Sequence, residues 1–101
     1  MEYLSKEKIF DIIRQHKDEL KKYGVKRIGL FGSFVRGEQN KSSDIDIIVE
    51  FEEGKKNFDN FINIAFLLEK LFGRDVDILT PESINKHLKP YIMREAIYEE
   101  I

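Results

Sequence analysis

Three aspartates are the residues of this sequence whose type and spacing could do metal chemistry. Asp44 and Asp46 alternate with apolar residues at the start of segment 44–51, which has the composition of a strand. Side chains two residues apart on a strand point to the same side, so these two carboxylates should lie close together. Neighbouring anions repel each other unless a cation lies between them, and Mg²⁺ prefers oxygen ligands. The pair therefore predicts a Mg²⁺ site.

Asp77 is the third acid, within the short apolar segment 76–79. A carboxylate placed in an apolar strand needs a partner. If this strand lies beside segment 44–51, three carboxylates meet, and such a set suits two Mg²⁺ ions acting on a phosphoryl group. Asp75 is the rival candidate, but the apolar neighbours Val76 and Ile78 favour Asp77.

A Gly-Ser turn precedes these acids and suits the binding of a nucleotide triphosphate. Gly32 lets the backbone approach a phosphate closely, and Ser33 could cap a short helix and donate its hydroxyl and N–H groups. Arg36 either pairs with phosphate through two hydrogen bonds or is a plain surface arginine. Ser43 either contacts the substrate or simply ends the loop through a side chain to backbone bond. We expect these four residues to form the nucleotide-binding part of the site.

Hydrophobic periodicity and turn residues divide the chain into six elements. We expect strands at 25–31, 44–51 and 76–79, a first helix from the cap Ser5 to Gly24, a helix at 58–72 and a last helix through 92–101. The second helix is apolar around most of its circumference, so we expect it to be deeply buried, with Phe58, Phe61 and Phe66 in the core. This order predicts an α/β (α+β) fold with a small mixed sheet flanked by helices, as a single domain spanning residues 1–101.

The composition of the chain limits which partners it could bind and where in the cell it could act. The chain has 101 residues, a net charge of −2 and no cysteine, which argues against a nucleic-acid partner and a disulfide framework. A local basic patch near Lys21, Lys22, Lys26 and Arg27 keeps nucleic acid open only as a minor alternative. No segment approaches the ~20 apolar residues of a spanning helix, and the N-terminus lacks the pattern of a signal peptide. We expect no membrane association and a cytoplasmic location.

The run Gly32-Ser33-Phe34-Val35-Arg36-Gly37, followed by Ser43-Asp44-Ile45-Asp46, resembles the minimal nucleotidyltransferases of the DNA polymerase β-like superfamily. The likeness covers nearly the whole chain, and its one mild departure is Val35, where alanine is common. The resemblance implies a polymerase β-like core. It further implies that Asp44 and Asp46 bind the metal, that Asp77 completes the catalytic triad, and that Gly32 and Ser33 hold the nucleotide phosphates.

Stand-alone chains of this kind resemble the antitoxin half of HEPN/MNT toxin–antitoxin pairs. What the resemblance implies is an enzyme that transfers AMP from ATP to a tyrosine hydroxyl of a partner HEPN ribonuclease toxin, using Mg²⁺. Two alternatives stay open. The chain could neutralise its partner by binding alone, with an exposed surface around Tyr91, Ile92 and Ile97, or it could modify a small molecule or RNA, although such enzymes usually carry an extra domain for the acceptor.

Overall fold

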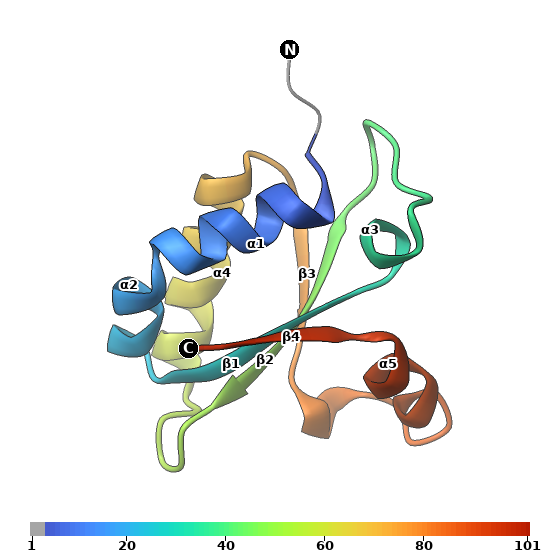
Figure 1. Cartoon of the computed structure of the whole chain (residues 1–101). Helices are drawn as coiled ribbons and strands as arrows, with labels where there is room; N and C mark the ends of the chain where they lie inside the picture. The colour runs from blue at the N-terminus through green and yellow to red at the C-terminus, as the bar shows by residue number, and fades with distance from the viewer. Residues whose placement is uncertain (1–3) are drawn as a thin grey trace.

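The protein is built around one small mixed sheet, as the computed structural model of residues 4–101 shows (Figure 1). The first residue of the expected domain, Met1, lies outside the described residues. In chain order the elements are α1 (Lys6–Gln15), α2 (Lys17–Lys22), β1 (Val25–Phe31), α3 (Ser33–Arg36), β2 (Ile45–Phe51), α4 (Phe58–Phe72), β3 (Val76–Leu79), a 3₁₀ turn η1 (Pro81–Ser83), α5 (Lys89–Glu95) and β4 (Ile97–Glu100).

The sheet has four strands in the order β3-β2-β1-β4. Strand β1 pairs antiparallel with both β2 and β4, whereas β2 and β3 are parallel. A parallel pair needs a crossover, and α4 provides it between β2 and β3. The expected small mixed sheet flanked by helices is confirmed. No helix among residues 4–101 is both long and apolar enough to cross a membrane.

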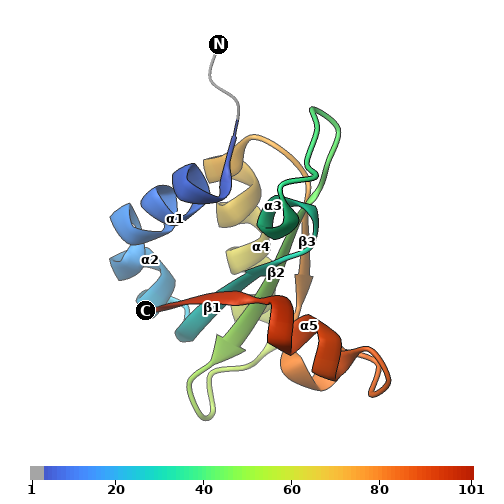
Figure 2. The ribbon, with the colours of Figure 1, turned by 45° about the vertical axis from the view of Figure 1, so that its right-hand side comes forward.

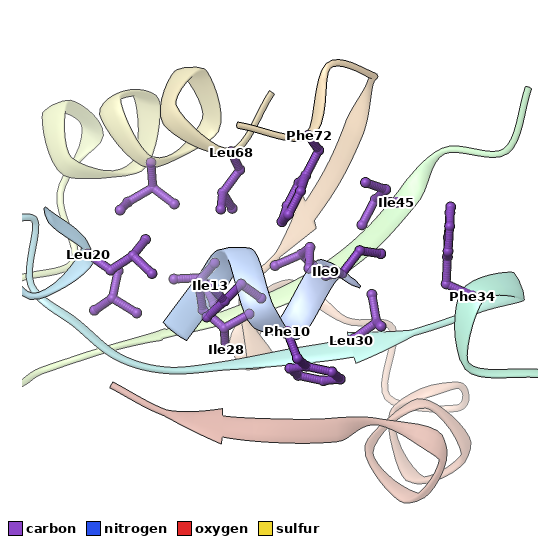
Figure 3. Packing of buried hydrophobic residues seen from close by; sticks show 14 residues of the cluster. Ile9, Phe10, Ile13, Leu20, Ile28, Leu30, Phe34, Ile45, Leu68 and Phe72 are labelled. Carbon is purple, nitrogen blue, oxygen red and sulfur yellow. The ribbon is translucent and has the colours of Figure 1, made fainter. Parts of the chain in front are cut away.

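The hydrophobic core fills the space between one face of the sheet and the helices α1, α2 and α4 (Figure 3). Alternate residues of β2, namely Ile45, Ile47 and Val49, are fully buried against these helices. Because the side chains of a strand alternate between faces, Asp46 must point to the other face of the sheet. Turning the molecule shows α5 lying away from α1, α2 and α4 (Figure 2). The core therefore fixes which face carries the acid.

The first helix begins at the expected cap but does not run unbroken to Gly24. The Ser5 hydroxyl accepts a hydrogen bond from the Lys8 N–H at 3.2 Å, as a helix cap should. At His16 the backbone leaves the helical region, with φ −120° and ψ 22°, and α2 begins with the next residue. The change of direction allows Leu20 of α2 to be buried in the same core as Ile9 and Ile13 of α1.

Helix α4 has one buried face only, so the expectation of a deeply buried helix was wrong. Ile64, Leu68 and Phe72 face the core, but the rings of Phe58 and Phe66 are 70% and 65% exposed. Phe61 is half-buried. An apolar circumference predicts a helix but does not reveal how many of its sides the rest of the fold covers.

The last segment contains a helix and a strand, not the single helix expected through 92–101. Helix α5 ends at Glu95. The next residue, Ala96, has an extended ψ of 139°, and Ile97–Glu100 forms β4 against β1. The pairing satisfies backbone groups of β1 that would otherwise form an open sheet edge. Helical spacing of apolar residues over so short a segment could not exclude this outcome, because Ile and Tyr also favour strands.

Tyr98 anchors β4 to the sheet through a contact that only a glycine permits. Gly29 of β1 is paired with Tyr98, and the tyrosine ring covers the glycine so closely that a Cβ there would lie 2.7 Å from Cε1. The ring also packs under the Arg27 guanidinium, 4.6 Å from its centroid. Glu99, the next residue, pairs with Arg14 at 3.1 Å and Lys17 at 3.0 Å, which ties the strand to α1 and α2.

We expect Gly29→Ala to destabilise the protein by about 1–3 kcal/mol, because the added methyl group must displace the Tyr98 ring. Urea or thermal unfolding measures this. In the Tyr98→Ala background the same substitution should be neutral or slightly stabilising, since the clash is gone and glycine is the poorer strand residue. An equal cost in both backgrounds would contradict the packing of β4 on β1.

Candidate active site

Asp46 and Asp77 lie side by side on the two parallel strands. Asp46 of β2 is the partner of Asp77 in β3, within a register that also matches Ile45 with Val76 and Ile47 with Ile78. In-register residues of parallel neighbours point to the same face, so both carboxylates project away from the core. Asp46 is partly buried and Asp77 is exposed. The structure thus brings together two acids that lie thirty-one positions apart in the sequence.

Asp44 and Asp75 lie one step before their strands. Asp44 directly precedes β2, is exposed and influences Asp46 electrostatically. Asp75 precedes β3, and its carbonyl accepts a hydrogen bond from the Ile45 N–H at 3.1 Å. The carboxylate that faces Asp46 across the strand register is that of Asp77 and not that of its rival Asp75.

The surroundings of Asp46 disfavour its ionised form. Burial raises the pKa of its carboxyl group, and the negative charges of Asp77 and Asp44 raise it further. The Arg36 guanidinium lowers the pKa, but it does not outweigh these effects. A cation bound beside Asp46 would offset the free-energy cost of ionising this carboxyl group.

Gly32 packs directly against Asp46. The last residue of β1, Phe31, is the register partner of Asp46, and Gly32 follows it with φ 78° and ψ −152°, a conformation open almost only to glycine. A Cβ on Gly32 would overlap the Asp46 carboxylate. The turn and the acid therefore occupy adjoining space, as a phosphate cradle facing a metal site requires.

Ser33 and Arg36 both belong to α3, the short helix that follows the turn. Gly32 is the cap of this helix and Ser33 is its first residue, so the expected capping role of Ser33 was wrong. Arg36 is held between two acids. Its Nε donates to Glu38 at 2.6 Å, and its Nη1 donates to both oxygens of Glu95 at 3.0 and 2.9 Å.

Ser43 closes the loop in front of Asp44. Its hydroxyl accepts the Asn40 N–H at 2.8 Å, and its carbonyl accepts a hydrogen bond from Arg74 at 3.0 Å. The structure therefore gives Ser43 the loop-ending role. A direct contact with substrate stays a prediction.

Glu95 is a residue beside Asp46 that the sequence did not reveal. It joins Gly32, Arg36 and Asp46 around an open cleft of about 370 Å³, which is also lined by Leu88, just before α5, and by Tyr91 and Ile92 of α5. Its carboxylate accepts the Gly32 N–H at 2.6 Å, across 63 positions of sequence. Nothing in the local sequence around Glu95 signals a contact made over such a separation.

The acids fit Mg²⁺ by chemistry but do not form a preassembled cage. Within residues 4–101 no three His, Cys, Asp or Glu side chains are arranged as the ligands of one metal ion. Mg²⁺ sites commonly use one or two carboxylates, with waters and substrate phosphates completing the shell. The raised pKa of Asp46 between Asp44 and Asp77 is the feature expected of carboxylates that share a cation. The donor set is therefore suited to a metal that arrives with its substrate.

Comparison with known proteins places the chain in a family. The nucleotidyltransferase domain model matches residues 13–99, and the chain belongs to this family. Among curated proteins, the chain is 40% identical over 99 residues to protein adenylyltransferase MntA of Thermococcus cleftensis, covering 97% of this chain and 99% of that protein. The resemblance noted in the sequence is thus confirmed.

Two solved structures share the fold. One, provisionally named a minimal nucleotidyltransferase, has a TM-score of 0.80 and 30% identity, with 96% of this chain and 98% of that chain covered. The other is a crystal structure of a toxin–antitoxin with AMP-PNP. It has a TM-score of 0.65 and 25% identity, with 94% of this chain and 72% of that chain covered.

We expect Asp46→Asn to stabilise the metal-free protein at pH 7 by about 1 kcal/mol, or about 4–8 °C, because the variant removes a carboxylate whose charge the fold disfavours. The pKa of Asp46 is raised in the folded state, so the penalty is present at neutral pH and disappears as pH falls through the folded-state pKa toward the unfolded one. Thermal unfolding in EDTA at several pH values measures both effects. A destabilised variant would contradict this electrostatic account.

Gly32→Ala should cost more stability than Gly37→Ala. Both glycines have positive φ, 78° and 73°, so each alanine is strained by about 1 kcal/mol or more. Only the Cβ at position 32 meets another group, because nothing lies within 4 Å at position 37. We expect a further 1–3 kcal/mol, roughly, for Gly32→Ala. Equal losses in urea unfolding would show that the turn does not press against Asp46.

Proposed function

We propose that this protein transfers AMP from ATP to a hydroxyl group of a partner protein. The observation that carries the proposal is the pairing of Asp46 with Asp77 on parallel strands, beside the Gly32 turn that packs against Asp46. Membership of the nucleotidyltransferase family supports the reaction class. The name of the Thermococcus cleftensis relative, protein adenylyltransferase, supports AMP as the transferred group and a protein as the acceptor.

In this proposal Asp44, Asp46 and Asp77 would hold two Mg²⁺ ions that accompany the triphosphate. When bound, the metal neutralises negative charge that develops on the phosphate during displacement. The pairing of Asp46 with Asp77, and a pKa of Asp46 that is raised by burial and by the charges of Asp77 and Asp44, support this assignment. The three carboxylates would also set the position of the α-phosphate relative to the acceptor.

The triphosphate is proposed to lie against Gly32 and Ser33, with Arg36 supplying a positive charge. Backbone N–H groups and a guanidinium are the donors that phosphate oxygens bind most readily in proteins. Gly32 and Arg36 border the same cleft as Asp46, and Ser33 follows Gly32 as the first residue of α3. The structure of a related toxin–antitoxin with AMP-PNP supports ATP as the nucleotide.

The chemical step exchanges one bond to phosphorus for another. The acceptor oxygen bonds to the α-phosphorus as the bond from that phosphorus to the pyrophosphate oxygen breaks. The hydroxyl proton must leave, and the exposed carboxylate of Asp77 is proposed to accept it. A tyrosine hydroxyl has an ordinary pKa of about 10, so it needs such help near neutral pH.

The acceptor is proposed to be a tyrosine of a HEPN-type ribonuclease toxin, which the transfer would silence. The toxin–antitoxin context of a related structure supports a toxin as the partner. The cleft is open and is bordered by two exposed residues, Leu88 before α5 and Tyr91 within it, which leaves room for a protein acceptor. A reaction that consumes ATP fits the cytoplasmic location expected from the sequence, and that location stays a prediction.

Intact-mass spectrometry of the partner toxin, after incubation with this protein, ATP and Mg²⁺, tests the proposal. We expect additions of about 329 Da for each AMP transferred. EDTA should abolish them, and excess Mg²⁺ should restore them.

Asp46→Asn and Asp77→Asn should each lower the rate by at least ~10²-fold, because they remove ligands of the reacting centre. The matched control is Asp75→Asn, which removes a neighbouring carboxylate outside the strand register and should stay within a few-fold of the natural protein. If the two proteins form a stable complex and the toxin gains no mass, the protein neutralises its partner by binding and not by AMP transfer. If AMP is added to a small molecule or RNA and not to protein, the acceptor is not the toxin.

A further inference from the structure

The carboxylate of Glu95 occupies the donors that the proposed reaction assigns to phosphate. Glu95 is the last residue of α5, and its side chain is 27% exposed. It accepts the Gly32 N–H at 2.6 Å and two hydrogen bonds from Arg36 Nη1, at 2.9 and 3.0 Å. One anion thus binds both the turn after β1 and the guanidinium of α3.

These contacts hold Glu95 as an anion beside another acid. Burial raises the pKa of Glu95, but the Gly32 N–H and the Arg36 guanidinium outweigh it and hold the pKa below its usual range. The Glu95 charge in turn disfavours ionisation of Asp46. Glu95 therefore adds negative charge to the cleft at the point where a triphosphate must enter.

We propose that Glu95 is an internal competitor of the nucleotide, which must displace its carboxylate from Gly32 and Arg36 before the phosphates can bind. The inference rests on the proposed function, since it takes Gly32 and Arg36 as phosphate donors. A single backbone N–H cannot serve two anions at full strength, and two anions within one small cleft repel each other. Glu95 thereby sets the affinity for ATP and stands apart from the residues that carry the chemistry.

Glu38 provides a matched control because its carboxylate pairs with the same arginine but does not accept the Gly32 N–H. It accepts from Arg36 Nε at 2.6 Å and is exposed. Glu38→Gln and Glu95→Gln each remove one negative charge beside Arg36, but only Glu95→Gln weakens the hold on the Gly32 N–H. A difference between the two variants therefore reports on the turn and not on charge alone.

The test is calorimetric binding of tripolyphosphate and of a non-hydrolysable ATP analogue with Mg²⁺. We expect Glu95→Gln to tighten both by roughly tenfold, in line with a lost charge-assisted competitor, and Glu38→Gln to change them by less than about threefold. In the transfer assay Glu95→Gln should lower KM for ATP while kcat does not rise. Unchanged or weaker binding in a folded Glu95→Gln protein would overturn the inference and leave the proposed function standing.

A measurement on the natural protein guards against a variant that fails to fold. Titration with tripolyphosphate, followed by NMR, should shift the Gly32 amide and the Glu95 side-chain carboxyl resonances together, as the bond between them is replaced. A Gly32 amide that shifts while the Glu95 carboxyl stays unchanged would overturn the inference. If neither the natural protein nor Glu95→Gln binds tripolyphosphate or the ATP analogue, the proposed function fails, and the inference fails with it.

Discussion

The register between β2 and β3 is the constraint on which the rest of the site depends. It places Asp46 and Asp77 opposite each other on one face, while Ile45 and Ile47 are fixed in the core on the other. A slip of one residue would bury the acid and expose the isoleucines, so the hydrophobic core itself holds the carboxylates in place. Helix α4, which makes the crossover between the two strands, contributes Ile64, Leu68 and Phe72 to that core. Hydrophobic packing on one face of the sheet thus holds the two carboxylates close together on the other face, where they repel each other.

The repulsion between these carboxylates is only partly offset by the nearby Arg36. Burial and two neighbouring acids disfavour the charge on Asp46, and Arg36 relieves this only in part. The same arginine is shared with Glu38 and Glu95, so the cleft has more negative charge than its own cations balance locally. Such an arrangement favours a ligand that brings divalent cations and phosphate oxygens together. It also accounts for a site that is not preassembled as a metal cage.

Much of this could be predicted from the sequence because it depends on short-range rules. Apolar flanks selected Asp77 over Asp75, and the observed register places Asp77 beside Asp46. The shared direction of Asp44 and Asp46, predicted from the period of two in a strand, stays a prediction, because Asp44 lies just before β2. A Gly-Ser pair after an apolar strand predicted the turn. The roles of these residues in binding metal and nucleotide stay predictions.

The features that the sequence did not reveal depend on distant contacts. Glu95 bonds to Gly32 across 63 positions, and β4 exists because β1 has a free edge and Gly29 admits the Tyr98 ring. Phe58 and Phe66 are exposed because the sheet covers only one side of α4, which periodicity within the helix cannot report. In each case a second element, remote in the chain, decides the structure.

Asp44, Asp46 and Asp77 are together proposed to hold the metal that accompanies the nucleotide. A crystal structure with Mn²⁺ and a non-hydrolysable ATP analogue tests this proposal most directly, because anomalous scattering locates the metal independently of the side chains. Mn²⁺ should lie within about 2.0–2.3 Å of oxygens from these three residues and from the triphosphate. Metal held by Asp75, or by phosphate alone with Asp46 and Asp77 turned away, would contradict it.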